Sequence, residues 1–358
     1  MTRIEKLQKE IEKINIARCA LIISVENRRY FTGFESSDGF LIVSSNDAVF
    51  ITDGRYIEAA QKAVTDCKVV LQERDFYTQL LNAIRSMNCS ELIFETDRTT
   101  VGIYRKLQEK FADITIICDT SLDNMIGNMR AVKDENEISN IKAAQKITDE
   151  AFSHMCSFIK PGMTEKEIQL ELDFYMLSHN GEALSFETIA VSGKNSSMPH
   201  GVPSFKKVEI GDFITMDFGT VVNGYHSDMT RTIALGNVSE KMKKVYNTVL
   251  KAQSECINSI KAGMSGSQGD KIARDVIEKE GFGEYFTHST GHSVGIEIHE
   301  APYLNTSEKT ILKDGMVVTV EPGIYIPGEF GVRIEDMVVI RDGGCEDLTA
   351  SPKELIIL

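Results

Sequence analysis

Roughly the first 120 residues alternate between short apolar runs and amphipathic stretches, which is typical of an α/β layered domain. Thr2 and Glu5 form a capping-box pattern ahead of apolar residues at helical spacing, so the chain is predicted to open with an amphipathic helix. The apolar runs that follow predict strands, and the stretches between them predict helices. The predicted strands are residues 20–24, 39–44, 48–52, 91–95 and 113–118, and the predicted helices are residues 55–63, 76–87 and 102–110.

A polar, charge-rich segment at residues 123–137 separates this part from the rest of the chain, and we place a domain boundary there. The two domains expected are residues 1–128 and residues 129–358. A long helix is predicted after the boundary, and a second capping-box pattern, Thr164 with Glu167, predicts another. The remaining sequence is rich in strand patterns, interrupted by two more helical stretches. The helices predicted after the boundary are residues 136–158, a helix that follows Thr164, and residues 240–262 and 268–281.

The composition is that of an ordinary globular protein, with 42% hydrophobic and 26% charged residues. The formal charge of -14 argues against sequence-independent binding to nucleic acid or to an anionic membrane. No apolar run follows the charged residues near the start, and no stretch has the ~18 apolar residues of a membrane span. The 7 cysteines are scattered without a C-x-x-C pattern, so we expect no disulfide framework and a cytoplasmic location.

Two aspartates are predicted to lie together on one face of a sheet. Asn223 and Gly224 between strand-like runs are typical of a type I′ hairpin. A two-residue loop there pairs Asp217 with Thr230. Asp228 is two residues from Thr230, so both carboxylates are expected as diagonal neighbours about 5–8 Å apart. Like charges this close favour a bound cation, although two solvated carboxylates on an exposed face fit the pattern equally well.

Three histidines fall close together in the sequence, His288, His292 and His299. Imidazole is both a metal ligand and a proton-transfer group near neutral pH. Strict alternation along a strand would place His292 and His299 on opposite faces, and only a bulge at Gly295 would bring them together. For any one of them, a structural role in the core or on the surface stays open.

Two further stretches place charged residues on apolar strands. Glu321 follows a buried-looking run that Pro322 and Gly323 end, so its carboxylate is expected at a strand terminus. Arg333 and Glu335 alternate on one face of the next apolar strand, where each needs a partner. Taken alone, Arg333 and Glu335 are better interpreted as a structural ion pair.

Together these stretches supply an imidazole and four carboxylates, those of Asp217, Asp228, Glu321 and Glu335. About four negative charges would be balanced by two divalent cations, as in two-metal hydrolases. Oxygen ligands with a single nitrogen favour Mn²⁺ or a similar ion over metals that prefer thiolates. The residues by themselves therefore suggest a dinuclear metal hydrolase.

At these motifs the chain resembles the pita-bread metallopeptidases, the family of Xaa-Pro aminopeptidase, prolidase and methionine aminopeptidase. Residues 129–358 resemble the catalytic domain, and residues 25–34 and 51–56 resemble the creatinase-type N-terminal domain. The resemblance implies an α/β (α+β) fold class. A creatinase-like α/β domain would be followed by a pita-bread catalytic domain with a curved, mostly antiparallel sheet covered by helices.

The resemblance also implies roles for single residues. The implied metal ligands, for two divalent ions expected to be Mn²⁺ with Co²⁺ or Zn²⁺ as alternatives, are Asp217, Asp228, His292, Glu321 and Glu335. The implied catalytic residues are His200, His299 and Glu321, and the implied substrate contacts are His200, His288, His299 and Arg333. Ser293 departs from the family, which usually has glycine after the ligand histidine, and its hydroxyl is expected to narrow the substrate cleft.

The implied reaction is hydrolysis of the N-terminal Xaa-Pro bond of a peptide by a hydroxide that bridges the two ions, with Glu321 as base and His299 stabilising the oxyanion. Similar prolidases often carry an arginine where this chain has Tyr303, and tyrosine cannot form the bidentate pair that arginine makes with a carboxylate. We therefore expect an Xaa-Pro aminopeptidase, with an Xaa-Pro dipeptidase as the alternative. A catalytically inactive binding protein is disfavoured because all five ligands are present. Relatives are commonly dimers, so a homodimer is expected.

Overall fold

The computed structural model describes residues 1–358, which form two compact units, Met1–Arg130 and Ala131–Leu358. The predicted boundary, between residues 128 and 129, lies inside helix α6 (Ser121–Ala131). The charged segment used to place that boundary is helical over most of its length. No helix in the chain combines the length and apolarity needed to cross a membrane.

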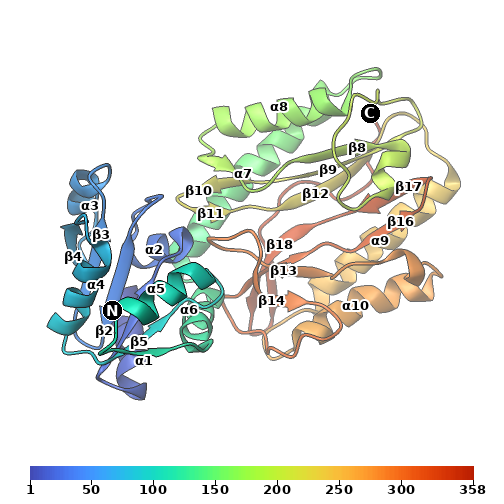
Figure 1. Cartoon of the computed structure of the whole chain (residues 1–358). Coiled ribbons are helices and arrows are strands. Elements are labelled where there is room, and N and C mark those ends of the chain that lie inside the picture. Colours follow the sequence, from blue (N-terminus) through green and yellow to red (C-terminus); the bar gives the residue numbers. More distant parts are fainter. The chain divides into compact units, whose positions relative to one another are not determined.

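The N-terminal unit is built on a six-stranded sheet in the order β4-β3-β2-β1-β5-β6 (Figure 1). The central strand β1 pairs antiparallel with β2 and parallel with β5, so the sheet is mixed. Its strands are β1 (Arg18–Ile22), β2 (Phe40–Ser44), β3 (Ala48–Thr52), β4 (Lys68–Leu71), β5 (Glu91–Phe94) and β6 (Thr115–Ile117). Its helices are α1 (Arg3–Ile14), α2 (Val25–Thr32), α3 (Ile57–Ala63), α4 (Phe76–Ser86), α5 (Val101–Lys110) and α6.

Local signals explain how these helices begin and end. Thr2 and Glu5 form the predicted capping box of α1, which buries Leu7 and Ile11. Helix α2, to which the sequence pattern assigned no element, begins at a cap formed by Ser24 and ends at Gly33, whose φ of 68° favours glycine. Its weak amphipathic pattern explains why periodicity did not predict it.

The C-terminal unit is made of antiparallel strand pairs with two pairs of helices (Figure 1). Strands run in the orders β12-β9-β8, β11-β10-β7, β14-β13-β15-β18-β19 and β16-β17. The first strands are β7 (Ala183–Leu184), β8 (Ile189–Ser192), β9 (Phe213–Phe218), β10 (Thr220–Val222), β11 (Tyr225–His226) and β12 (Met229–Ala234). The later strands are β13 (Gly291–Ser293), β14 (Glu300–Leu304), β15 (Val317–Val320), β16 (Gly323–Ile326), β17 (Phe330–Arg333), β18 (Asp336–Arg341) and β19 (Gly344–Asp347).

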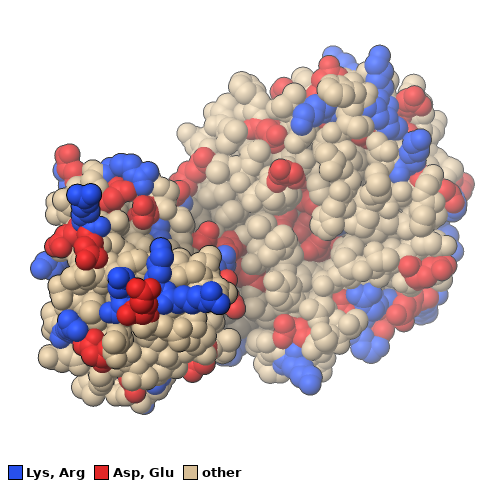
Figure 2. Space-filling model, viewed as in Figure 1, with Lys and Arg blue, Asp and Glu red and all other residues tan.

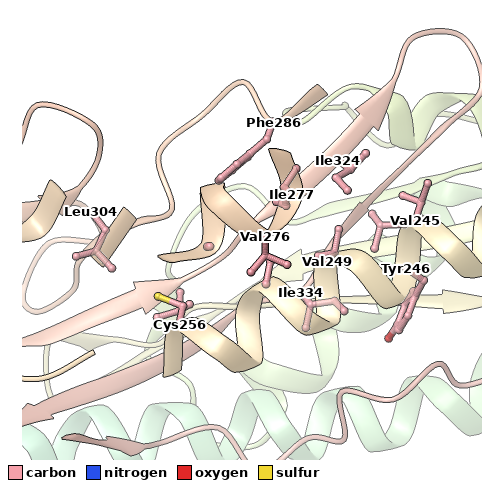
Figure 3. Close-up of a cluster of buried hydrophobic side chains, with 14 of the residues drawn as sticks. Val245, Tyr246, Val249, Cys256, Val276, Ile277, Phe286, Leu304, Ile324 and Ile334 are labelled. Carbon is pink, nitrogen blue, oxygen red and sulfur yellow. The ribbon is translucent and has the colours of Figure 1, made fainter. Parts of the chain in front are cut away.

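Four helices cover these strands. Helices α7 (Glu135–Phe158) and α8 (Glu165–Ser178) contact β10 and β8, whereas α9 (Glu240–Ser259) and α10 (Gly266–Lys279) contact β17 and β14. Figure 3 shows α9 and α10 inserting apolar side chains between themselves and the strands. The labelled members of this core are Val245, Tyr246, Val249, Cys256, Val276, Ile277, Phe286, Leu304, Ile324 and Ile334. The predicted α/β N-terminal layers and helix-covered antiparallel C-terminal sheet are confirmed.

The predicted hairpin is confirmed to the residue. Asn223 and Gly224 have φ values of 49° and 79°, as a type I′ turn requires. Val222 pairs with Tyr225, and further along the hairpin Asp217 of β9 pairs with Thr230 of β12. The turn chemistry therefore sets which residues face each other at the site.

Candidate metal centre and active site

A cavity of about 640 Å³ in the C-terminal unit collects every residue that the sequence analysis proposed for the site. The proposed residues that line it are His200, Asp217, Asp228, His288, His292, His299, Glu321, Arg333 and Glu335. On the face shown in Figure 2, acidic and basic side chains are interspersed among uncharged ones, and acidic side chains also lie within a hollow of this unit.

Asp217 and Arg333 form an ion pair at one wall of the cavity. The Asp217 Oδ2 atom accepts a hydrogen bond of 2.6 Å from Arg333 Nη2. Its Oδ1 atom is buried and has no hydrogen-bond partner. The suggested structural pair of Arg333 with Glu335 is wrong, because Glu335 lies in the link between β17 and β18 and Arg333 pairs with Asp217 instead. The Asp217 Oδ1 atom is thus left for a ligand.

Three further carboxylates surround His292. One ligand atom from each of Asp228, His292 and Glu335 lies within 4.8 Å of the other two. The His292 Nε2 atom is 3.5 Å from Asp228 Oδ2 and 3.5 Å from Glu321 Oε1. Glu321 follows β15 directly, at the strand terminus that Pro322 predicted. These carboxylate oxygens and the single imidazole nitrogen are donors that fit divalent cations.

Burial and mutual repulsion perturb this cluster strongly. Burial, followed by the charges of Asp217 and Glu321, raises the pKa of Asp228 well above its usual range. Burial, followed by the charge of Asp228, does the same to the pKa of Glu335, and burial raises the pKa of Glu321 to about 8. Burial also lowers the pKa of His292 to about 4, so its imidazole is neutral and able to ligate near pH 7. Bound cations would stabilise four carboxylates that are held this close together.

The remaining histidines reach the cavity from loops. His299 lies just before β14, and its ring centroid is 4.4 Å from that of His292. The sequence left open whether a bulge at Gly295 brings His292 and His299 together. In the structure the pairing of β13 with β14 shifts register between His292 and Ser293, β13 ends at Ser293, and a loop over residues 294–299 carries His299 back. His288 shares a hydrogen bond of 2.9 Å between its Nε2 atom and the Tyr325 hydroxyl.

Ser293 does not narrow the cleft. Its side chain is fully buried and does not line the cavity. The hydroxyl donates to the carbonyl of Val317 at 2.8 Å and accepts from Lys133 Nζ at 3.0 Å. The expectation drawn from the missing glycine is therefore wrong, because on β13 the side chain of Ser293 points away from the face that carries His292.

Two residues of the site were missed by sequence reasoning. The Thr230 hydroxyl donates to Glu335 Oε2 at 2.6 Å and accepts from Arg333 Nε at 2.9 Å. The hairpin register, which placed Thr230 opposite Asp217, held the signal that could have identified it. The Tyr325 hydroxyl accepts from Arg333 Nη1 at 2.7 Å, and no local pattern marks this tyrosine.

Comparison with known proteins gives two family matches. Residues 139–342 match the model of metallopeptidase family M24, and residues 3–132 match that of the creatinase/prolidase N-terminal domain. The chain is similar to the structure of an Xaa-Pro dipeptidase from Bacillus anthracis, with 43% identity, 99% of each chain covered and a TM-score of 0.95. It is also similar to that of an X-Pro aminopeptidase from Thermotoga maritima, with 37% identity, 100% of each chain covered and a TM-score of 0.92. A Pyrococcus furiosus Xaa-Pro dipeptidase is 35% identical over 99% of both chains.

Proposed function

This chain belongs to metallopeptidase family M24, and from that premise we propose that it is an Xaa-Pro aminopeptidase holding two divalent metal ions. Its substrate would be a peptide with proline at the second position, cleaved at the first bond. The observation that carries the proposal is the convergence of Asp217, Asp228, His292, Glu321 and Glu335 on one cavity. The complete ligand set weighs against an inactive binding protein of this fold.

The proposed ligands divide into two groups by their contacts. His292 lies within 3.5 Å of both Asp228 and Glu321, whereas Asp217 keeps one buried oxygen without a partner. We assign Asp217 to one ion, His292 to the other, and the remaining carboxylates to either or both. Two divalent ions held there would supply Lewis-acid activation of the scissile carbonyl and of a water molecule.

The proton chemistry is assigned to residues of the chain. Glu321 accepts the proton of the attacking water and returns it to the leaving proline nitrogen. The pKa of His299 is lowered by burial, so its neutral imidazole can donate a hydrogen bond to the oxyanion as it forms. His200 and His288 line the same cavity and would contact the peptide. Arg333 fixes Asp217 through their ion pair.

The choice between aminopeptidase and dipeptidase depends on whether the cavity offers a positive charge to the C-terminal carboxylate of a dipeptide. Tyr303 lines the cavity and carries no positive charge, which favours longer peptides over dipeptides. One observation favours a dipeptidase as the second candidate. Lys166 also lines the cavity, and its ammonium group donates to the amide oxygen of Gln169 at 2.7 Å and pairs with no carboxylate. It could bind the free carboxylate of a dipeptide.

A comparison of substrates tests the proposal. After reconstitution with Mn²⁺, kcat/KM is measured for an Xaa-Pro dipeptide, an Xaa-Pro-Yaa tripeptide and a matched Xaa-Ala-Yaa tripeptide. We expect the Xaa-Pro-Yaa tripeptide to be cleaved at least about tenfold faster than either control, with release of Xaa. Preference for the dipeptide, reduced by Lys166→Met, would establish the second candidate. No hydrolysis by protein that binds two ions would overturn both.

Three finer expectations stay predictions. Mn²⁺ as the physiological metal is tested by elemental analysis of protein purified without added metal, and a homodimer by light scattering coupled to size-exclusion chromatography. A cytoplasmic location is tested by cell fractionation.

A further inference from the structure

His200 lies on a segment with few apolar anchors. Residues 193–206 link β8 towards β9 and contain one short 3-10 helix, Gly193–Ser197. Several of its large apolar side chains are exposed to solvent. These are Met198, Val202 and Phe205, with exposed fractions of 50%, 78% and 84%. Burial of apolar surface therefore does not determine where this segment places His200, and polar contacts must do so.

A single buried carboxylate, that of Glu165, fastens both ends of the segment. Glu165 is the first residue of α8 and has no solvent exposure. Its Oε1 atom accepts from the backbone nitrogen of Ser192 at 2.7 Å, from the Ser192 hydroxyl at 2.9 Å and from the Asn195 amide at 3.1 Å. Its Oε2 atom accepts from the backbone nitrogen of Ser204 at 3.1 Å and from the Ser204 hydroxyl at 2.7 Å. The two ends of the segment thus meet at one side chain.

No lysine or arginine balances this charge directly. The nearby Lys206 ammonium bonds to the Ser192 hydroxyl and to Asp212, and forms no ion pair with Glu165. Both carboxylate oxygens are instead surrounded by uncharged donors, which come from Ser192, Asn195 and Ser204. An amide at this position would place an NH2 donor against these donors, so the segment needs both acceptor oxygens of the carboxylate.

The opposite side of the segment is tied to the metal site. Arg333 Nη1 donates to the carbonyl of Pro199 at 3.3 Å, while its Nη2 atom donates to Asp217. The Ser196 hydroxyl accepts from the backbone nitrogen of Gly331 at 2.9 Å. The backbone next to His200 is therefore held by Arg333, through the carbonyl of Pro199, and the two ends of the segment are held by Glu165.

We propose that Glu165 is a positioning residue for His200: it holds the segment 193–206 so that the His200 imidazole faces the substrate. Glu165 itself does not line the cavity, so it would act on catalysis only through the residues it positions, and the dependence on His200 tests whether the segment is the route. The inference rests on the proposed function, in which His200 contacts the peptide. Preorganisation by such supporting contacts commonly changes activity by about 10–100-fold.

A double-mutant cycle between Glu165 and His200 tests this role. The variants are Glu165→Gln, His200→Ala and their combination, with kcat and KM measured on the best Xaa-Pro substrate and bound metal measured on the same samples. The matched control is Glu167→Gln, which alters an exposed carboxylate in the same turn of α8 that contacts only Thr164. Circular dichroism checks that each variant is folded.

We expect Glu165→Gln to keep its metal and to lower kcat/KM by about 10–100-fold, because the ligands lie on other elements. In the His200→Ala background the same substitution should change kcat/KM by less than about twofold, as should Glu167→Gln in the wild type. An equal loss with and without His200, or no loss at all, would overturn the inference. If Glu165→Gln fails to fold, Ser204→Ala, which removes one donor from the far end of the segment, replaces it in the same cycle.

Two further results distinguish a wrong proposed function from a wrong role for Glu165. If His200→Ala keeps full activity, the assigned role of His200 is wrong, and the positioning claim falls with it. If the wild type cleaves no Xaa-Pro bond, hydrogen exchange decides the matter: faster exchange across residues 193–206 in Glu165→Gln supports the anchoring, and unchanged exchange overturns it.

Discussion

Replacing Lys133 by methionine tests whether a buried ion pair holds the stretch that carries His292 and His299. Lys133 Nζ lies 3.1 Å from Glu300 Oε2, and their side chains are 1% and 6% exposed. The same ammonium donates to the Ser293 hydroxyl. Ser293 and Glu300 directly follow His292 and His299, so one lysine bridges the two ends of the loop between β13 and β14.

The expected cost follows from this burial. Removing one partner of a buried pair leaves the other charge without its compensation and costs about 3–5 kcal/mol. Methionine keeps most of the volume of the lysine stem, so the loss from packing should be small. With an unfolding slope of ~3 kcal/mol/M in urea, the midpoint of the C-terminal unit should fall by about 1–1.7 M. Combining Lys133→Met with Glu300→Gln removes both charges and should restore much of this loss.

Urea titrations of metal-free protein, followed by circular dichroism, measure these shifts. Lys142→Met is the matched control, because Lys142 pairs with Glu346 at the surface, where the side chains are 45% and 41% exposed. That variant should lose less than about 1 kcal/mol. The reasoning is refuted if Lys133→Met costs no more than Lys142→Met, or if adding Glu300→Gln destabilises Lys133→Met further.

Three other outcomes are expected. Ser293→Ala should cost about 1 kcal/mol in urea unfolding and leave KM unchanged, because its hydroxyl bonds within the core; an altered KM would return Ser293 to the cleft. The pKa of Glu321, raised to about 8 in the folded chain, exceeds its unfolded value, so this group weakens folding as the pH rises from about 4.5 to 8. Melting curves in EDTA should show this fall, Glu321→Gln should reduce it, and Mn²⁺ should stabilise most at the upper end. Gly224→Ala, at a φ of 79°, should destabilise the hairpin by about 1 kcal/mol and lower the metal affinity measured by calorimetry. An unchanged affinity would show that the turn does not position the metal ligands.

The parts of the site that were predictable from sequence are those that strand pairing determines. The turn at Asn223 and Gly224 sets the register, so the pairing of Asp217 with Thr230 followed from turn chemistry alone. The position of Glu321 at a strand end followed from the proline after it. The convergence of separate strands on one cavity did not follow from any spacing, and the resemblance to a family supplied it.

Loop geometry failed where it depended on distant polar groups. The sequence offered a bulge at Gly295, yet the structure uses a loop in which a Cβ on Gly295 would lie 2.6 Å from the Glu300 carboxylate. The alternation of apolar and polar residues could not predict that contact, because the position of the Glu300 carboxylate depends on its ion pair with Lys133. The hydrogen bonds to neighbouring strands fix the position of a strand. A loop that buries few apolar side chains must be fixed by other interactions.

In the C-terminal unit, buried charged side chains supply these interactions. Lys133 fastens the loop that carries His299, and Glu165 fastens the segment that carries His200, each from outside the cavity. Both residues look solvated in sequence, since a charged residue at the start of a helix or between helices is usually exposed. Each is buried only because the segment it holds folds over it. Activity should therefore be sensitive to two charged positions that no pattern of ligands or of apolar residues marks, and insensitive to exposed charges nearby such as Glu167 and Lys142.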